Sequence, residues 1–129
     1  MSTIDNRYQG RREPVVRIEV PTINCPNGAT AEVTTTVPFN MTLKTIVVRA
    51  GACAGANPTF TLKLSDDNGA VHLTKATIVK DAKTVLLSTK TTHDFDEICM
   101  NGIITVGITP SLDPATVGGV NVNVDLYGV

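Results

Sequence analysis

The last ten residues of the chain, VNVNVDLYGV (120–129), alternate between apolar and polar side chains. Successive side chains of a β-strand point to opposite faces, so this alternation predicts a strand with one buried face. The apolar members are Val120, Val122, Val124 and Leu126, and the polar members are Asn121, Asn123, Asp125 and Tyr127. An apolar sheet face needs a second layer to cover it, so the segment predicts layered β-structure.

Further segments carry the same signal, either as alternation or as an enrichment in Thr and Val, which favour pleated strands. They are VVRIEV (15–20), ATAEVTTTV (29–37), MTLKTIVVRA (41–50), FTLKL (60–64), VHL (71–73) and EICMNGIITVGITP (97–110). The short PFN between the second and third segments predicts two antiparallel neighbours. Residues 74–97 are ambiguous: a short helix near 76–87 competes with a loop followed by a strand at 83–88, which the β-branched residues favour.

This pattern predicts an all-β fold, an antiparallel β-sandwich of about seven or eight strands with a jelly-roll or Greek-key layout. Residues 14–129 form the single domain of this prediction. Residues 1–13 are polar, lack periodicity and are expected to form an extended N-terminal arm.

Composition argues against several classes of function. A net charge of −1 lacks the basic excess typical of nucleic-acid binders. Aromatic residues make up only 4% and Trp is absent, which disfavours stacking platforms for sugars or bases. No apolar run reaches the roughly 20 residues of a membrane span, and the N-terminal segment does not resemble a signal peptide, so synthesis in a cytoplasm is expected. Three widely spaced cysteines, Cys25, Cys53 and Cys99, favour buried free thiols over a disulfide.

The segment SDDNG (65–69) allows two interpretations, a calcium loop or a hairpin tip. An EF-hand loop needs a bidentate Glu about six residues after its glycine, where this chain has Lys75. Asn-Gly between alternating segments is a strong hairpin signal, because both residues tolerate positive φ. A hairpin is therefore predicted, whose Asp66 and Asp67 either keep an exposed tip soluble or contact a basic patch on a partner.

The sequence gives weaker evidence for a catalytic or metal-binding site. HDFDE (93–97) holds a His with three carboxylates, but alternation along a strand would divide them between two faces, so a solvated acidic loop is preferred over a metal site. No GxSxG or SxxK motif occurs. We therefore expect no enzymatic activity, metal, cofactor or small-molecule substrate.

The arm carries Arg7, Arg11 and Arg12. These side chains can meet phosphates or the acidic surface of a protein partner, and Asp5 and Glu13 dilute their charge. An arm that orders on a neighbouring subunit fits as well as phosphate binding, and a terminus without function is the third alternative.

The order of features over 41–129 resembles a family of small β-sandwich proteins found on the heads of tailed bacteriophages. The resemblance rests on KTIVVRAG with a small-residue loop, then NPTFTLKLSDDNGAV with its acidic turn, and a last strand VNVNVDLYGV. That family includes capsid decoration (cement) proteins and minor head proteins. The segment 20–30 and the arm have no clear counterpart in it.

The resemblance implies a virion structural protein, made in the host cytoplasm and placed on the capsid surface. Its partner would be the major capsid protein, whose subunits it bridges on the expanded head, often as a homotrimer with multivalent attachment. The alternatives are a head–tail joining, tail or head-fibre protein and, less favoured, a carbohydrate-binding or other surface-binding β-module.

Overall fold

The structure, a computed structural model, describes residues 15–55, 58–88 and 94–129. Within these ranges the chain forms strands, turns and loops and no helix. All strand pairs are antiparallel. The strands are β1 (Val16–Glu19), β2 (Ile23–Cys25), β3 (Val33–Ala50), β4 (Thr59–Asp66), β5 (Val71–Val79), β6 (Ala82–Leu87), β7 (Ile98–Pro110) and β8 (Val120–Gly128). The predicted all-β antiparallel class is confirmed.

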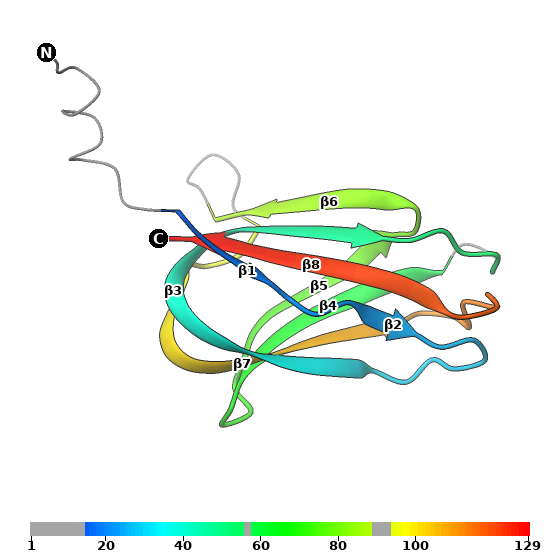
Figure 1. Cartoon of the computed structure of the whole chain (residues 1–129), viewed down its shortest axis with the longest axis horizontal. Helices are drawn as coiled ribbons and strands as arrows, with labels where there is room; N and C mark the ends of the chain where they lie inside the picture. The colour runs from blue at the N-terminus through cyan, green and yellow to red at the C-terminus, as the bar shows by residue number, and fades with distance from the viewer. Residues whose placement is uncertain (1–14, 56–57, 89–93) are drawn as a thin grey trace, which may run out of the picture.

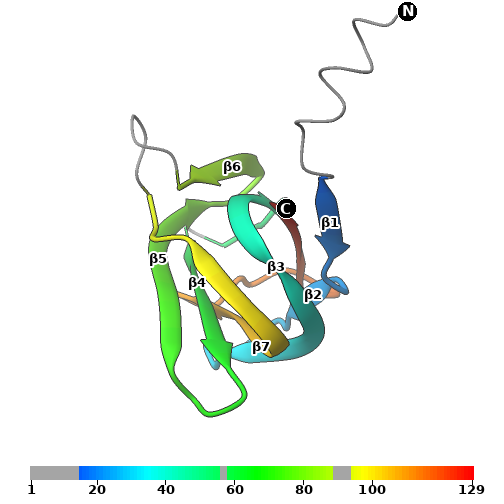
Figure 2. The same cartoon turned by 90° about the vertical axis from the view of Figure 1, so that its left-hand side faces the viewer.

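The strands form two layers that face each other across the core (Figures 1 and 2). One layer has the order β5–β4–β7–β3, in which β3 contributes its first half. The other has the order β6–β3–β8–β1, in which β3 contributes its second half and β2 also pairs with β8. Strand β3 therefore belongs to both layers, and Figure 2 shows it turning from one layer to the other.

The prediction of two strands joined by PFN is wrong, because β3 continues without a break from Val33 to Ala50. Pro38 lies inside it, opposite Ile103 of β7. The first half of β3 has β7 as its partner strand and forms an edge of its layer. An edge position tolerates proline, because the missing N–H can face away from the paired strand.

A β-bulge explains how one strand serves both layers. The pairing of β3 with β8 shifts register between Leu43 and Thr45. Before the bulge the odd-numbered Val37, Phe39, Met41 and Leu43 are buried, and after it the even-numbered Ile46, Val48 and Ala50 are buried. One extra residue reverses which side chains face inward, so both halves bury their apolar sets as the strand bends.

The core lies between the layers and contains the predicted apolar faces. Ile104, Val106 and Ile108 of β7 are fully buried, as are the inward residues of β4 and β8. All three phenylalanines are buried: Phe39, Phe60 and Phe95. The ambiguous segment contains the strand β6 rather than a helix. The few aromatic rings of this chain are thus used largely for packing.

The three cysteines are free, as predicted, but they differ in exposure. Cys25 is buried, Cys53 is partly buried and Cys99 is exposed, so the prediction of burial is correct for Cys25 alone. Burial raises the pKa of the Cys25 thiol, because the thiolate would lose its hydration. Separately, the described residues contain no helix long and apolar enough to cross a membrane.

Candidate protein-docking face

The outer surfaces of the two layers differ in chemistry. The outer surface of β5–β4–β7–β3 is rich in hydroxyl groups, and the pairs Thr36–Thr105 and Thr61–Thr109 lie side by side on it. Asn40 and Asn101 extend this polar surface along the first half of β3. The outer surface of β6–β3–β8–β1 instead presents arginine and tyrosine, two residue types that are enriched in protein interfaces.

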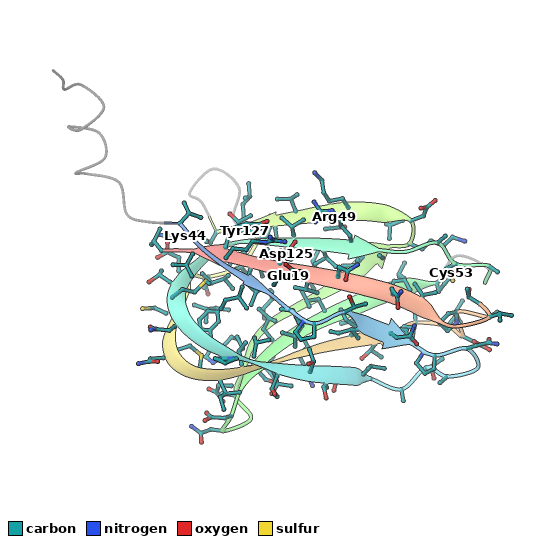
Figure 3. All side chains as sticks on the ribbon, viewed as in Figure 1. Glu19, Lys44, Arg49, Cys53, Asp125 and Tyr127 are labelled. Atoms are coloured by element: carbon teal, nitrogen blue, oxygen red, sulfur yellow. The ribbon has the colours of Figure 1, made fainter. Side chains whose placement is uncertain are left out.

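We call this second surface the docking face and define it by the strand register. Its side chains form three rows across β6, β3, β8 and β1, since directly paired residues of antiparallel strands point to the same side. The rows are Leu87–Thr45–Tyr127–Arg17, Val85–Val47–Asp125–Glu19 and Lys83–Arg49–Asn123. Figure 3 shows Tyr127, Asp125, Glu19 and Arg49 gathered on this side of the molecule, while Cys53 lies toward the opposite end.

Asp125 is the buried polar side chain of the docking face, with 8% of its side chain exposed. Arg17 Nη2 donates to its Oδ1 at 3.1 Å, and Arg49 Nη1 donates to its Oδ2 at 3.4 Å. A buried carboxylate without partners would be strongly unfavourable, so two cations from different strands satisfy its charge. The carboxylate thereby connects β1 and β3 across β8.

Asp125 also fixes the two arginines, each of which stays about half exposed. The guanidinium carbon of Arg17 lies 6.0 Å from the centroid of the Tyr127 ring, within the range of a cation–π contact. Arg17 Nη2 also lies 3.4 Å from Glu19 Oε2. The hydrogen bond and charge of Asp125 raise the pKa of Arg17 above its ordinary value, so this side chain keeps its charge.

An apolar patch lies beside these charges, on β6 and the neighbouring position of β3. Val85 is 44% exposed, and Val47 and Leu87 are partly exposed. Apolar side chains next to arginine and tyrosine in fixed positions are common in protein-binding surfaces. The rigid sheet beneath it lowers the entropy cost of binding.

The structure places Asp66 and Asp67, the predicted contact residues of the hairpin, in different environments. The β4–β5 hairpin is present, and Gly69 has the positive φ of 88° that the Asn-Gly signal predicts. Asp66 Oδ1 accepts hydrogen bonds from the backbone N–H of Asn68 and Ala70, both at 2.9 Å. Its Oδ2 lies 3.0 Å from His72 Nε2. Asp66 thus stabilises the turn, while Asp67 is exposed.

An exposed hairpin tip predicts that replacing both Asp66 and Asp67 with alanine leaves folding nearly intact, and these contacts change that expectation for Asp66. The hydrogen bond from Ala70 and then the one from His72 lower the pKa of Asp66. We expect Asp66→Ala to lower Tm by about 3–6 °C at neutral pH, as for the loss of a short hydrogen-bonded network. Thermal unfolding followed by circular dichroism would measure this, with Asp67→Ala as the matched control that removes an exposed carboxylate.

The lowered pKa of Asp66 also predicts how the stability difference between the parent and Asp66→Ala changes with pH. A carboxyl whose pKa is lower in the folded protein stabilises it above the unfolded value of about 3.9 and loses that effect as the pH falls through the folded value. The Tm difference between the parent and Asp66→Ala should therefore shrink in acid. A difference that stayed constant down to the most acid pH at which the protein folds would show that the charge of Asp66 contributes nothing.

The remaining candidate residues from the sequence are described only in part. Arg7, Arg11 and Arg12 lie outside the described residues, as does His93. Asp94 Oδ2 accepts a hydrogen bond from Leu87 N, and Glu97 pairs with Lys44. Within the described part of the chain, no group of three or more His, Cys, Asp or Glu side chains is placed to hold a metal ion.

One concave region lies near the bend of β3. It is an open depression of about 350 Å³ lined by Asn40, Met41, Thr42, Cys99, Met100, Asn101 and Val129. Pockets for small ligands usually enclose most of the ligand surface. This depression is wide open to solvent and lined by uncharged side chains, so we assign it no ligand.

The docking face was not identified from the sequence, because its central contacts are long-range. Alternation places Asp125 with Tyr127 and Asn123 on a polar face, which is correct. Arg17 and Arg49 are 108 and 76 residues away from Asp125. The order of strands brings them together, and a single sequence does not state that order.

Comparisons with known proteins show distant likenesses only. No protein-family model matches the chain, and no curated protein matches it significantly. A serine protease of Aeromonas sobria is 9% identical with a TM-score of 0.40, covering 95% of this chain and 29% of that one. The infectious bursal disease virus Gx strain structure is 16% identical with a TM-score of 0.37, covering 91% and 32%. A family two carbohydrate esterase from Cellvibrio japonicus is 11% identical with a TM-score of 0.40, covering 90% and 34%. The chain spans about a third of each, and these values carry no functional argument.

Proposed function

We propose that the protein is a capsid decoration (cement) protein that binds the expanded head of a tailed bacteriophage and bridges subunits of the major capsid protein. The observation that carries this proposal is the docking face, where two half-exposed arginines, held by a buried aspartate, lie beside an apolar patch. The layout over 41–129, which resembles the head proteins of such phages, supplies the identity of the partner. In this proposal the protein acts on the outer surface of the virion.

The physical properties of the domain suit this role. A decoration protein gains affinity when several modest interfaces act on one rigid oligomer, and we propose a homotrimer for this reason. A sheet whose polar side chains are already paired loses little freedom on binding. Only 18% of the residues are charged, and on the docking face Arg17 and Arg49 already pair with Asp125, which lowers the cost of removing their charges from water.

A second virion role deserves a test beside the first, because the same face would serve a head–tail joining, tail or head-fibre protein. A carbohydrate-binding module fits less well. The three phenylalanines are buried, and Tyr127 is partly buried beside the Arg17 guanidinium. Sugar recognition usually relies on exposed aromatic rings, which these side chains do not provide.

Binding to heads tests the proposal. Purified protein is mixed with expanded heads that lack it and, in parallel, with unexpanded procapsids, and both mixtures are sedimented. We expect saturable binding to expanded heads and none to procapsids. Failure to bind either particle, together with location of the protein at the portal or tail of virions, would refute decoration and support the second role.

A further inference from the structure

The docking face carries more basic than acidic side chains. Its bases are Arg17, Arg49 and Lys83, and its acids are Asp125 and Glu19, so the face has a formal charge of +1 (3 − 2) within a chain of net charge −1. The excess of positive charge is larger among the exposed side chains, because Asp125 is only 8% exposed. The two arginines are 50% and 53% exposed and Lys83 is exposed, and the one exposed acid of the face is Glu19, at 73%.

The two arginines keep hydrogen-bonding capacity for a partner. A guanidinium group has five N–H donors in a fixed planar fork that suits carboxylate oxygens. Arg17 and Arg49 donate to different oxygens of the same carboxylate, which fixes each group by one of its edges. Their orientation is thus settled before a partner arrives, and such pre-organisation lowers the cost of binding.

We infer that the docking face receives an acidic protein surface, whose Asp or Glu carboxylates bind Arg17 and Arg49 while its apolar side chains cover Val85 and Val47. The identification of that surface with the phage head rests on the proposed function. The carboxylate chemistry follows from the face itself. Asp125 acts as a positioning residue that holds both arginines toward the partner.

A protein partner fits this face better than a nucleic acid does. Nucleic-acid surfaces bind through many basic contacts to phosphates, and bases stack on free aromatic rings. The docking face has three bases offset by two acids, and its Tyr127 ring lies beside Arg17. Its apolar patch at Val47 and Val85 would gain nothing from a phosphodiester chain but matches apolar side chains of a protein.

The test compares Arg49→Gln with Lys63→Gln. Arg49→Gln leaves the 3.1 Å contact between Arg17 and Asp125 in place, so the fold is expected to survive. Lys63 pairs with Glu32 at 3.3 Å in the other layer, so Lys63→Gln removes one paired positive charge elsewhere. Two probes are used independently. The first is expanded heads that lack the protein, and the second is a decaglutamate peptide, whose binding is measured through the amide chemical shifts of the protein. Circular dichroism confirms folding, and Arg49→Lys tests rescue of the charge.

We expect Arg49→Gln to weaken binding to heads about thirtyfold, as for a hot-spot arginine, and Lys63→Gln to leave it unchanged. Arg49→Lys should restore part of the loss, and binding of the parent should weaken as salt rises. The peptide should shift amide signals of β3 and β8 around Arg49 and Asp125.

The outcomes separate the two proposals. If the parent fails to bind heads but the peptide shifts these signals, the decoration role is refuted and the acidic-partner inference is supported. Equal head binding by Arg49→Gln and the parent, or peptide shifts confined to the other layer, would overturn the inference. Tight binding of single-stranded DNA through Arg49, without any response to the peptide, would overturn it in favour of a nucleic acid.

Discussion

Replacing Gly128 by alanine is expected to lower the free energy of unfolding by about 3 kcal/mol or more, because the new methyl group has no room. A Cβ at this position would overlap the carbonyl oxygen of Thr42 and lie 2.8 Å from Met41 Sδ. The oxygen cannot move freely, since Thr42 and Val129 exchange two backbone hydrogen bonds of 2.8 and 3.1 Å there. The substitution therefore acts on the closure of β8 against the bend of β3.

Gly102→Ala is the matched control for this prediction. Gly102 also lies inside a strand, β7, but a Cβ there would meet one atom, Met100 Cε, at 3.7 Å. Alanine loses less backbone entropy than glycine on folding, so Gly102→Ala is expected to be neutral or slightly stabilising. Urea unfolding followed by far-ultraviolet circular dichroism measures both, as the chain contains no Trp for fluorescence. Similar stabilities for the two variants would refute the close contact at Gly128.

Phe60→Ala is expected to lower the free energy of unfolding by about 3–5 kcal/mol, the usual range for a buried aromatic ring. Phe60 is fully buried in the inner face of β4, where it pairs with Ile78 of β5 and Pro110 of β7. Its removal leaves a cavity at the point where three strands of one layer meet. Sheet packing of this kind relaxes only in part, so the cavity cost adds to the lost burial.

Two further variants separate cavity formation from a general sensitivity of this layer. Phe60→Leu keeps much of the volume and is expected to cost about 1–1.5 kcal/mol. Ile103→Ala truncates a side chain of the neighbouring strand β7 that is 46% exposed, and its effect should stay below about 1 kcal/mol. Equal losses for Phe60→Ala and Ile103→Ala would contradict the assignment of Phe60 to the core.

The sequence predicts most of the strands and the class of fold, because these depend on local alternation. The last strand, the buried face of β7 and the Asn-Gly hairpin follow directly from the residues that form them. The continuity of β3 does not, because PFN has the composition of a turn. The sequence does contain one sign of it: the buried apolar residues occupy odd positions up to Leu43 and even positions from Ile46. Such a change marks a bulge in a single bent strand.

The docking face depends on information of another kind. Each of its rows combines side chains from three or four strands that are far apart in the sequence. Asp125 has the same local pattern as the exposed Asn123, but its carboxylate is buried and pairs with two half-exposed arginines from other strands. At the hairpin, the sequence identifies Asp66 as a candidate contact, but not its hydrogen bonds to Asn68 and Ala70. Local pattern predicts position on a face, and tertiary neighbours decide what a side chain does there.

The most direct test of the account is to image expanded heads at high resolution with and without the bound protein. We expect additional density on the outer surface of the head, with the β6–β3–β8–β1 layer against the shell and acidic side chains of the capsid subunits beside Arg17 and Arg49. Density that contacts the shell through the hydroxyl-rich layer or the β4–β5 hairpin would contradict the assignment of the docking face. Density found only at the portal or tail would contradict the decoration role itself.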